Sequence, residues 1–521
     1  MKRTIDDWPR RLLDDRTLLY EGGEVEEAIR SQITRVHVAP HVTEISSNAF
    51  RACRKLVDVE FNEGLNVIRG GAFEECTALR SVTIPSTVTK VGCRAFYRCG
   101  NLVEVELKEG LQVIGEGAFE RCTALRSAAI PSTISQWGNF AFLGCSDMTE
   151  VLMKEGLQAI GLRAFEGCRS LRSVTLPSTV TKLGNMAFCE CHHLVELKLN
   201  EGLHDTGSKT FGNCTALRSV TIPSSVTKLG WQAFEGCYNL AEVHLNEGLQ
   251  VIRDCAFSRC MALRSVVVPL SVTHLGRAAF QNCSNLVEVQ LNEGLRAIEG
   301  CAFRGCVACQ SVTIPSTVTN LGWCTFGDCS TLSEVIFLGG SRLLNHKILD
   351  RRLSSEERIL DQTILHKMMD ETTFLKCSEL RTIKVSTSWA LSGRIAQLSH
   401  ECRISVAERI RNLPWLELMQ NGDVLACFPV SRAAGGRSKL KVPDTHNETA
   451  RSLHQVLQLI AFHELKESSI LIELALWKSR IDSGQVEPRV HCRVPMPDPA
   501  KCLIMEYCGF VGFLEPAIEG A

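Results

Sequence analysis

The chain has 521 residues, with 57 Lys and Arg against 58 Asp and Glu, and a formal net charge of -1 at pH 7. This balance argues against a dedicated nucleic-acid binder or a polybasic membrane-surface protein, because both need a concentrated positive field. Hydrophobic residues make up 45% and charged residues 22%, which are ordinary values for a folded protein. The 25 cysteines, and the 21 phenylalanines against 4 tyrosines, are unusual counts. What they indicate about the fold depends on how these residues are arranged along the chain.

The N-terminal segment, residues 1–32, contains no pattern of a secretory signal. Charges interrupt every apolar pair in its first 21 residues, MKRTIDDWPRRLLDDRTLLYE. The longest nearly apolar runs, such as Ile470–Trp477, are far shorter than the roughly 20 residues that span a bilayer. We therefore expect a cytoplasmic protein without a membrane span and with mostly reduced thiols, the alternative being the cell surface reached by an unconventional route. The alternating segment Ile33–Val38 is predicted to be the strand that starts a sheet.

Phenylalanine recurs every 23 residues, and cysteine follows three positions after each phenylalanine. This frame holds for thirteen units without an insertion. The pairs are Phe50 and Cys53, Phe73 and Cys76, Phe96 and Cys99, Phe119 and Cys122, Phe142 and Cys145, Phe165 and Cys168, Phe188 and Cys191, Phe211 and Cys214, Phe234 and Cys237, Phe257 and Cys260, Phe280 and Cys283, Phe303 and Cys306, and Phe326 and Cys329. One such unit has too little apolar surface to form a core alone, so successive units must stack as a solenoid. Phe and Cys then form interior ladders, and Val82 and Ile84 represent the inward positions of a parallel strand.

The motif around each pair identifies a family resemblance. It reads roughly Ile/Leu-Gly-x-x-Ala-Phe-x-x-Cys-x-x-Leu, as in Ile114–Leu125. Over residues 33–338 it resembles the BspA-like, or type 5, leucine-rich repeat. The resemblance implies a β-rich α/β solenoid, a right-handed stack of 23-residue coils with a parallel sheet, and a binding rather than a catalytic role. Many relatives are surface-exposed and adhesive, so a surface or secreted adhesin-like repeat protein is the alternative to an intracellular scaffold.

Adjacent units differ, and the full period is a pair of 46 residues. The outward position eight residues after Phe alternates between serine and an acid, the acids being Asp58, Glu104, Glu150, Glu196, Glu242, Glu288 and Glu334. Arginine begins the intervening strands at Arg80, Arg126, Arg172, Arg218 and Arg264. Two interpretations are open: an Arg/Glu ladder that neutralises itself, or an extended face that binds a protein partner. His244, Val267 and Ile336 depart from the polar pattern on this face, and the last two predict an apolar patch.

The 23-residue frame stops after Gly340. Apolar residues at helical spacing after Ser354 or Ser355, a candidate helix N-cap, predict a helical insertion over residues 339–372. Phe374 and Cys377 restore the signature, 48 residues beyond Phe326. We expect a terminal repeat over 373–386, placed after a degenerate, inserted one.

Residues 387–521 are predicted to be a helical C-terminal region. The expected elements are a helix over 392–419 broken at Pro414, a loop over 427–446, and two amphipathic helices over 449–481 interrupted near Glu467-Ser468-Ser469. This region resembles the helical tail of intracellular members of the family in unicellular eukaryotes. It is predicted to cap the open C-terminal edge of the solenoid, because an exposed edge strand invites aggregation, or else to be an independent partner-docking module.

The sequence offers no convergent catalytic set. It contains no phosphate-binding glycine loop followed by Lys-Ser/Thr and no Gly-x-Ser-x-Gly elbow. Cys189-Glu-Cys191-His192-His193 carries ligand types for zinc, but Cys191 belongs to the ladder. Cys309, three residues after Cys306, stands where other units have leucine, and His463-Glu464 lacks the second histidine of a zincin.

The sequence therefore predicts a non-enzymatic scaffold for an unidentified protein partner, with no catalytic residue, metal, cofactor or nucleic acid, and a monomeric state. The rivals are the adhesin and an enzyme housed after residue 387.

Overall fold

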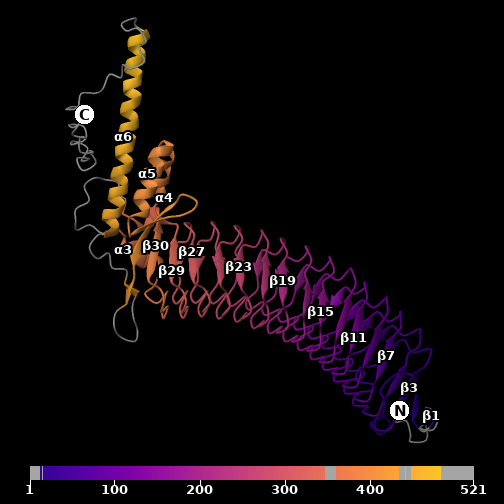
Figure 1. The fold of residues 1–521 in the computed structure, drawn as a ribbon. Helices are drawn as coiled ribbons and strands as arrows, with labels where there is room; N and C mark the ends of the chain where they lie inside the picture. Colours follow the sequence, from indigo (N-terminus) through magenta and orange to yellow (C-terminus); the bar gives the residue numbers. More distant parts are fainter. Residues whose placement is uncertain (1–11, 15, 346–358, 433–439, 442–447, 483–521) are drawn as a thin grey trace. The chain divides into compact units, whose positions relative to one another are not determined.

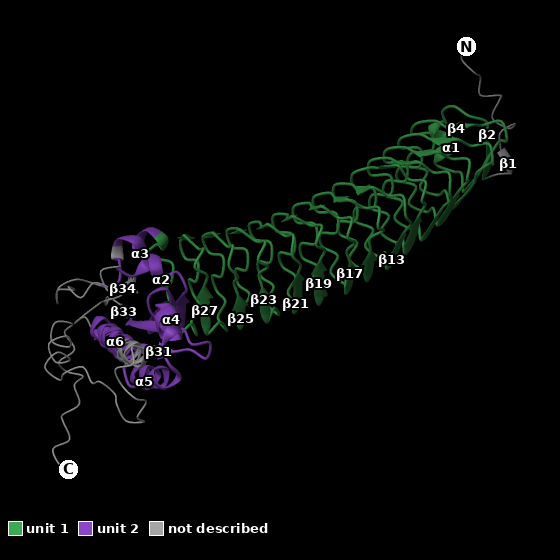
Figure 2. Cartoon of the chain, turned by 90° about the horizontal axis from the view of Figure 1, so that it is seen from above, with its two compact units in different colours: residues 1–333, 368–379, 436–439 green, residues 334–367, 380–435, 440–521 purple. Residues whose placement is uncertain are grey.

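The computed structural model describes residues 12–14, 16–345, 359–432, 440–441 and 448–482 (Figure 1). The chain divides into two compact units (Figure 2). Unit 1 comprises residues 1–333, 368–379 and 436–439, and unit 2 comprises residues 334–367, 380–435 and 440–521.

Unit 1 is a solenoid in which each 23-residue unit, here called a rung, contributes two short strands. Each of the longer strands after the first follows a cysteine of the ladder. They are β3 (Arg35–Val38), β5 (Asp58–Glu60), β7 (Ser81–Ile84), β9 (Glu104–Leu107), β11 (Ser127–Ile130), β13 (Glu150–Met153), β15 (Ser173–Thr175), β17 (Glu196–Lys198), β19 (Ser219–Ile222), β21 (Glu242–Leu245), β23 (Ser265–Val267), β25 (Glu288–Gln290) and β27 (Ser311–Ile314). The pairings found among these strands are parallel, with partners 23 residues apart, as in Ser81 opposite Glu104. The predicted parallel repeat solenoid is thus confirmed, and its long strands run side by side in Figure 2.

A second series of parallel two-residue strands precedes the phenylalanines. It consists of β4 (Glu44–Ile45), β6 (Val67–Ile68), β8 (Lys90–Val91), β10 (Val113–Ile114), β12 (Gln136–Trp137), β14 (Ala159–Ile160), β16 (Lys182–Leu183), β18 (Asp205–Thr206), β20 (Lys228–Leu229), β22 (Val251–Ile252), β24 (His274–Leu275), β26 (Ala297–Ile298) and β28 (Asn320–Leu321). These strands are not predictable from the sequence pattern, because two residues are too few for alternation to be visible.

The phenylalanine ladder forms the centre of unit 1. Successive rings from Phe50 to Phe326 are stacked with centroids 5.1–5.6 Å apart and planes within 14° of parallel. All thirteen side chains are buried, including the central Phe96, Phe119, Phe142, Phe165 and Phe188. Along the strands, Val82 and Ile84 are buried while Ser81 and Thr83 are exposed. The inward assignment of both sets is confirmed.

The cysteine ladder lies beside the phenylalanines and has a hydrogen-bonding role. From Cys76 to Cys329, each thiol donates to the carbonyl oxygen of the phenylalanine in the preceding rung, at 3.1–3.4 Å. Burial raises the pKa of Cys168, Cys237 and Cys283 to about 12. The thiols therefore stay protonated at neutral pH, as a donor must.

At the N-terminal end of unit 1, the sheet starts earlier in the chain than the sequence predicted. β2 (Thr17–Tyr20) pairs in parallel with β3 and in antiparallel with β1 (Leu12–Asp14), so the expectation that residues 33–38 start the sheet is wrong. Tyr20 covers the first phenylalanine, with a centroid distance of 5.0 Å to Phe50. β2 belongs to a segment that lacks the Phe and Cys signature, and α1 (Glu27–Arg30) follows it in the chain.

At the other end, Phe374 stacks directly on Phe326 at 5.6 Å. Cys377 donates its thiol proton to the carbonyl of Phe326 at 2.9 Å, and Phe326 N donates to Thr373 O. Phe374 and Cys377 therefore continue the two ladders directly from the rung of Phe326, so the degenerate rung expected between them is wrong. The extra residues between the two rungs are an insertion rather than an additional layer of the ladder. The bounds 373–386 of the terminal repeat stay a prediction.

Among its described residues, unit 2 combines short β-strands with five helices. Its elements are β29 (Glu334–Phe337), α2 (Gly340–Leu343), α3 (Gln362–Met368, whose last residue falls in unit 1), β30 (Thr382–Ser386), α4 (Ser388–Gln397), α5 (His400–Arg411), β31 (Leu416–Leu418), β32 (Val424–Pro429), β33 (Ser431–Arg432), β34 (Leu440–Lys441) and α6 (Glu448–Asp482). β30 pairs in parallel with β29 and in antiparallel with β32, which pairs with β31. α4, α5 and α6 pack together, with Leu391, Ile410 and Ile460 buried. The capping role of these helices stays a prediction.

Several predicted elements of unit 2 need correction. The expected helix over 392–419 is two helices, α4 and α5, and the second ends before Pro414. Residues 427–429, predicted as loop, lie in β32. α3 begins at Gln362, and the carboxylate of Asp361 accepts hydrogen bonds from Thr363 N and Ile364 N at its start. The predicted caps Ser354 and Ser355 lie outside the described residues.

The two helices expected over 449–481 are one continuous helix, α6. Ser468 and Ser469 do not interrupt it, because their hydroxyls donate to the carbonyls of Glu464 and Lys466 within the helix, at 2.8 and 2.9 Å. Within the part of the chain that is described, no helix is both long and apolar enough to cross a membrane.

Candidate interaction face

The turns of unit 1 explain one half of the 46-residue alternation. In four of the rungs with a Glu-Gly-Leu turn, the glutamate accepts hydrogen bonds from a serine of the next rung. Glu155, for example, accepts from Ser178 N at 3.0 Å and from Ser178 Oγ at 2.9 Å. The same clasp joins Glu109 to Ser132, Glu201 to Ser224 and Glu293 to Ser316. Glu247 instead accepts from Leu270 N and Ser271 N. The two turn types are therefore complementary, and this alternation serves the fold.

Glycine is needed in the same turn because of a close approach on its other side. Gly110 has φ +109°, and a Cβ there would lie 2.1 Å from the carbonyl oxygen of Ser86 in the preceding rung. A side chain at this position would therefore separate the two turns.

The contacts of Glu109 with Lys154 and Ser132 predict a stability contribution that depends on pH. The hydrogen bonds from Lys154 and then Ser132 lower the pKa of Glu109 to about 2, against about 4.3 in an unfolded chain. Because the folded pKa is depressed, the contribution is present above about pH 4.3 and is lost as pH falls toward 2. The melting temperature of Glu109→Gln should lie below that of the native chain at pH 7, and the gap should close between these two pH values.

Glu116→Gln provides a control for this experiment, since Glu116 is an exposed acid whose side chain makes no hydrogen bond or ion pair among the described residues. Calorimetry at several pH values compares the variants. A gap between Glu109→Gln and the native chain that is independent of pH would contradict the clasp.

The second half of the alternation lies on the outer surface of the long strands. We define the charged face as Asp58, Glu104, Glu150, Glu196, Glu242, Glu288, Arg80, Arg126, Arg172, Arg218 and Arg264, all in unit 1 and all exposed. Each acid is the first residue of its strand. The glutamates lie opposite serines, as Glu150 lies opposite Ser127 and Ser173, whereas Asp58 lies opposite Arg35. With about 4.8 Å between neighbouring strands, acids are about 9.6 Å apart, and an arginine immediately precedes each strand between them.

These charges do not neutralise one another within the chain. Among the described residues, no ion pair within 4.0 Å joins any of the five arginines to an acid. The backbone carbonyl of Arg80 accepts from Val103 N at 2.8 Å, but its guanidinium remains in solvent. The self-neutralising ladder expected as one interpretation is therefore not formed, and the face keeps its charges available.

Two residues of the predicted binding face belong elsewhere. Ile336 is buried, with 9% of its surface exposed, so its assignment to an apolar surface patch is wrong. It lies in β29 of unit 2, opposite Lys384 of β30. Glu334, at the start of β29, forms an ion pair with Lys384, which is also paired with Glu417. His244 and Val267 do lie exposed on long strands, Val267 with 49% exposure.

Exposed valines also belong to this surface, and the sequence analysis did not single them out. Each of them immediately precedes an acid of the charged face, at the position where the serine rungs carry arginine. They are Val57, Val103, Val195 and Val287, with 37% to 54% of their surface exposed. The signal was present in the repeated Val-Glu-Val, whose first valine resembles a core residue in the sequence alone.

The residues tested for chemistry have structural partners. Cys191 donates to Phe165 O, while His192 and His193 lie within hydrogen-bond distance of the carbonyls of Asn213 and Arg169. Cys306 and Cys309 are both buried, and burial raises the pKa of Cys309 to about 11. Across the described ranges, no group of three or more His, Cys, Asp and Glu side chains could hold a metal ion.

The zincin-like dipeptide His463-Glu464 lies in α6. His463 is buried, and burial lowers its pKa, so the imidazole is neutral at pH 7. Glu464 binds the guanidinium of Arg394 through both oxygens, at 2.8 and 2.6 Å. Among the described residues, neither side chain belongs to a group that could hold a metal ion.

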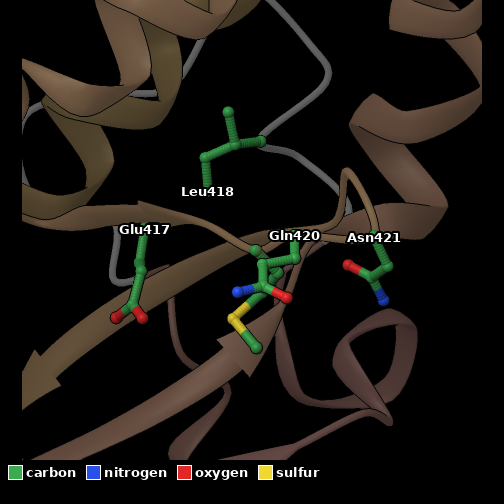
Figure 3. Close-up of a pocket in the computed structure, with 5 residues that line it drawn as sticks. Glu417, Leu418, Gln420 and Asn421 are labelled. Carbon is green, nitrogen blue, oxygen red and sulfur yellow. The ribbon is translucent and has the colours of Figure 1, made fainter.

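A surface hollow of about 450 Å³ lies at the hairpin between β31 and β32 (Figure 3). It is lined by Glu417, Leu418, Met419, Gln420 and Asn421. Glu417 is its one charged residue and is paired with Lys384. The hollow therefore offers no free acid, base or nucleophile.

The fold and its exposed face define a repeat scaffold built from stacked rungs. The model of the BspA type leucine-rich repeat region matches residues 29–149, 136–264 and 251–349. The chain belongs to this family, whose repeats generally serve as non-enzymatic scaffolds.

Solved structures with a similar fold include three from bacteria. A leucine-rich repeat protein from Bacteroides ovatus shares 22% identity over 62% of this chain and 82% of its own, with a TM-score of 0.49. A leucine-rich cell surface protein from Faecalibacterium prausnitzii shares 21% identity over 72% of this chain and 92% of its own, with a TM-score of 0.35. A leucine-rich repeat protein from Eubacterium ventriosum shares 17% identity over 61% and 90%, with a TM-score of 0.38. No curated protein matches the chain.

Proposed function

We propose that this protein is a non-enzymatic scaffold that binds a protein partner through the charged face of unit 1. The main support is that the five arginines and six acids of this face are exposed and form no ion pair among the described residues. The glutamates and serines of the turns, by contrast, are hydrogen-bonded to one another within the fold. Extended solenoid surfaces bind proteins because their outward side chains contribute little to the core.

We also propose a cytoplasmic location. The support is the role of the ladder thiols, which serve as hydrogen-bond donors and would lose that role on oxidation. All 22 cysteines in the described residues are free thiols. A fluorescent fusion in the source cell tests this proposal, and a surface location would favour the adhesin instead.

Affinity purification from the source cell tests the scaffold function. A face variant replaces the five arginines of the charged face by glutamine. A matched variant makes five such changes at exposed basic residues off the face, namely Lys90, Lys182, Lys228, Arg259 and Arg296. Mass spectrometry should recover the same protein with the native and the matched chains and at least about tenfold less of it with the face variant. Equal recovery with all three chains would contradict the proposed face.

A further inference from the structure

We propose that the charged face of unit 1 binds a second copy of the same chain in an antiparallel, two-fold symmetric dimer. This inference rests on the proposed use of the charged face and names its partner. The evidence is charge complementarity, because the face carries both signs at equal spacing and leaves both unpaired within one copy.

The spacing of the charges makes the face complementary to itself. Arginine rungs and acid rungs alternate, so each sign recurs about every 9.6 Å and the two series are offset by one rung of about 4.8 Å. Arginine immediately precedes the outward serine of its strand, and the acid takes that outward position in the next rung, as Arg80 and Glu104 illustrate. Two copies shifted by one rung therefore place every arginine of the face opposite an acid rung.

Symmetry decides the orientation of the second copy. A two-fold axis along the solenoid would set each rung against its own equivalent, with arginine facing arginine and acid facing acid. A two-fold axis parallel to the strands reverses the order of the rungs, so that arginine rungs face acid rungs when the axis passes between two rungs. Because like charges in contact are strongly unfavourable, the antiparallel arrangement is selected.

The register follows from placing the axis at the middle of the ladder, between the rungs of Arg172 and Glu196. All five arginines then meet a glutamate of the other copy. The five unique pairs, each occurring twice in the dimer, are Arg80 with Glu288, Arg126 with Glu242, Arg172 with Glu196, Arg218 with Glu150, and Arg264 with Glu104.

The exposed valines supply the apolar part of this contact. Val103, Val195 and Val287 precede Glu104, Glu196 and Glu288 in their rungs. In the antiparallel register each of these valines faces the stem of an arginine, whose methylene groups pack on apolar surface while the guanidinium reaches the acid. The sequence predicted a monomer, and measuring the mass of the chain in solution distinguishes the two states.

The central pair provides the test, with sedimentation velocity of the purified full-length chain at increasing concentration. The native chain should dimerise at about 50 mM salt and dissociate at about 500 mM, since salt screens surface charges. R172E and E196R should each weaken the dimer at least about tenfold, because each sets like charges together. R296E, an equal charge change at an exposed residue off the face, should leave the dimer intact.

Mixing R172E with E196R gives the sharper outcome. In the mixed dimer the R172E side chain faces the E196R side chain, and the native Glu196 faces the native Arg172, so association should return. A native chain that is monomeric at low salt, or a dimer that R172E does not weaken, would overturn the proposal. If the native chain is monomeric while affinity purification still depends on the face, the dimer fails and the scaffold function stands; if neither depends on the face, both fail.

Discussion

Replacing Phe188 by alanine is expected to destabilise unit 1 by roughly 3–5 kcal/mol. Phe188 is fully buried between two rings, with centroids 5.2 Å from Phe165 and 5.6 Å from Phe211. Its removal leaves a cavity that neighbouring rungs cannot fill, because their own rings are held in the same stack. The disruption should be greatest in the rungs on either side, since a solenoid is stabilised by nearest neighbours.

Hydrogen exchange is the suitable measurement, because long repeat arrays need not unfold in one step. Amides of the rungs around residue 188 should exchange much faster in the variant than in the native chain. Tyr238→Ala, which removes an aromatic ring that is 39% exposed, serves as the control and should cost within about 0.5 kcal/mol. A loss below about 1 kcal/mol for Phe188→Ala would contradict the structural role of the ladder.

Replacing Lys384 by methionine is expected to destabilise unit 2 by about 2–3 kcal/mol. Lys384 is buried in β30, and its ammonium group pairs with Glu334 and Glu417. Removing it leaves two carboxylates facing each other without a cation. Breaking a fully buried pair costs about 3–5 kcal/mol, and the lower value allows for the partial exposure of the two acids.

The pH dependence of this contribution is opposite in sign to that of Glu109. Burial acts to lower the pKa of Lys384, but the two carboxylates more than offset it and raise the pKa above its ordinary value. The contribution is therefore fully present below about pH 10.4 and is lost as pH rises through the higher folded pKa. The difference in free energy of unfolding between the native chain and Lys384→Met should thus be constant from neutral pH to about pH 9 and shrink only in strong alkali.

Lys376→Met is the matched control for charge removal. Lys376 also has an acidic partner, Asp328 at 3.5 Å, but its side chain is 72% exposed. Denaturant titration should give a loss of at most about 1 kcal/mol for this variant. An equal loss for both lysine variants would mean that burial does not strengthen the Lys384 cluster.

The solenoid could be predicted from the sequence because its information is repeated. One Phe and one Cys every 23 residues determine which side chains face inward, and thirteen copies make the pattern unmistakable. Elements that occur once were harder to predict. The strand ending at Tyr20 lacks the signature, and α6 continues through Ser468 and Ser469 because their hydroxyls satisfy local carbonyls, which no spacing rule reveals.

The candidate face was predicted in part. The alternation of Arg and Glu is legible in the sequence, but whether neighbours pair depends on side-chain geometry that the sequence does not contain. Ile336 illustrates the same limit, because its place in the repeat frame is outward and the strands of unit 2 nevertheless bury it.

The clasps between turns have a consequence for how such a chain can change in length. Four glutamate turns are matched to the serine turn that follows each of them, as Glu155 is matched to Ser178. Loss or gain of a single 23-residue rung would place two turns of the same kind together and leave a clasp without its partner. Loss or gain of 46 residues would preserve every clasp and also the order of charges on the outer face. The heritable module of this protein is therefore the pair of rungs, and its length is expected to vary in steps of two.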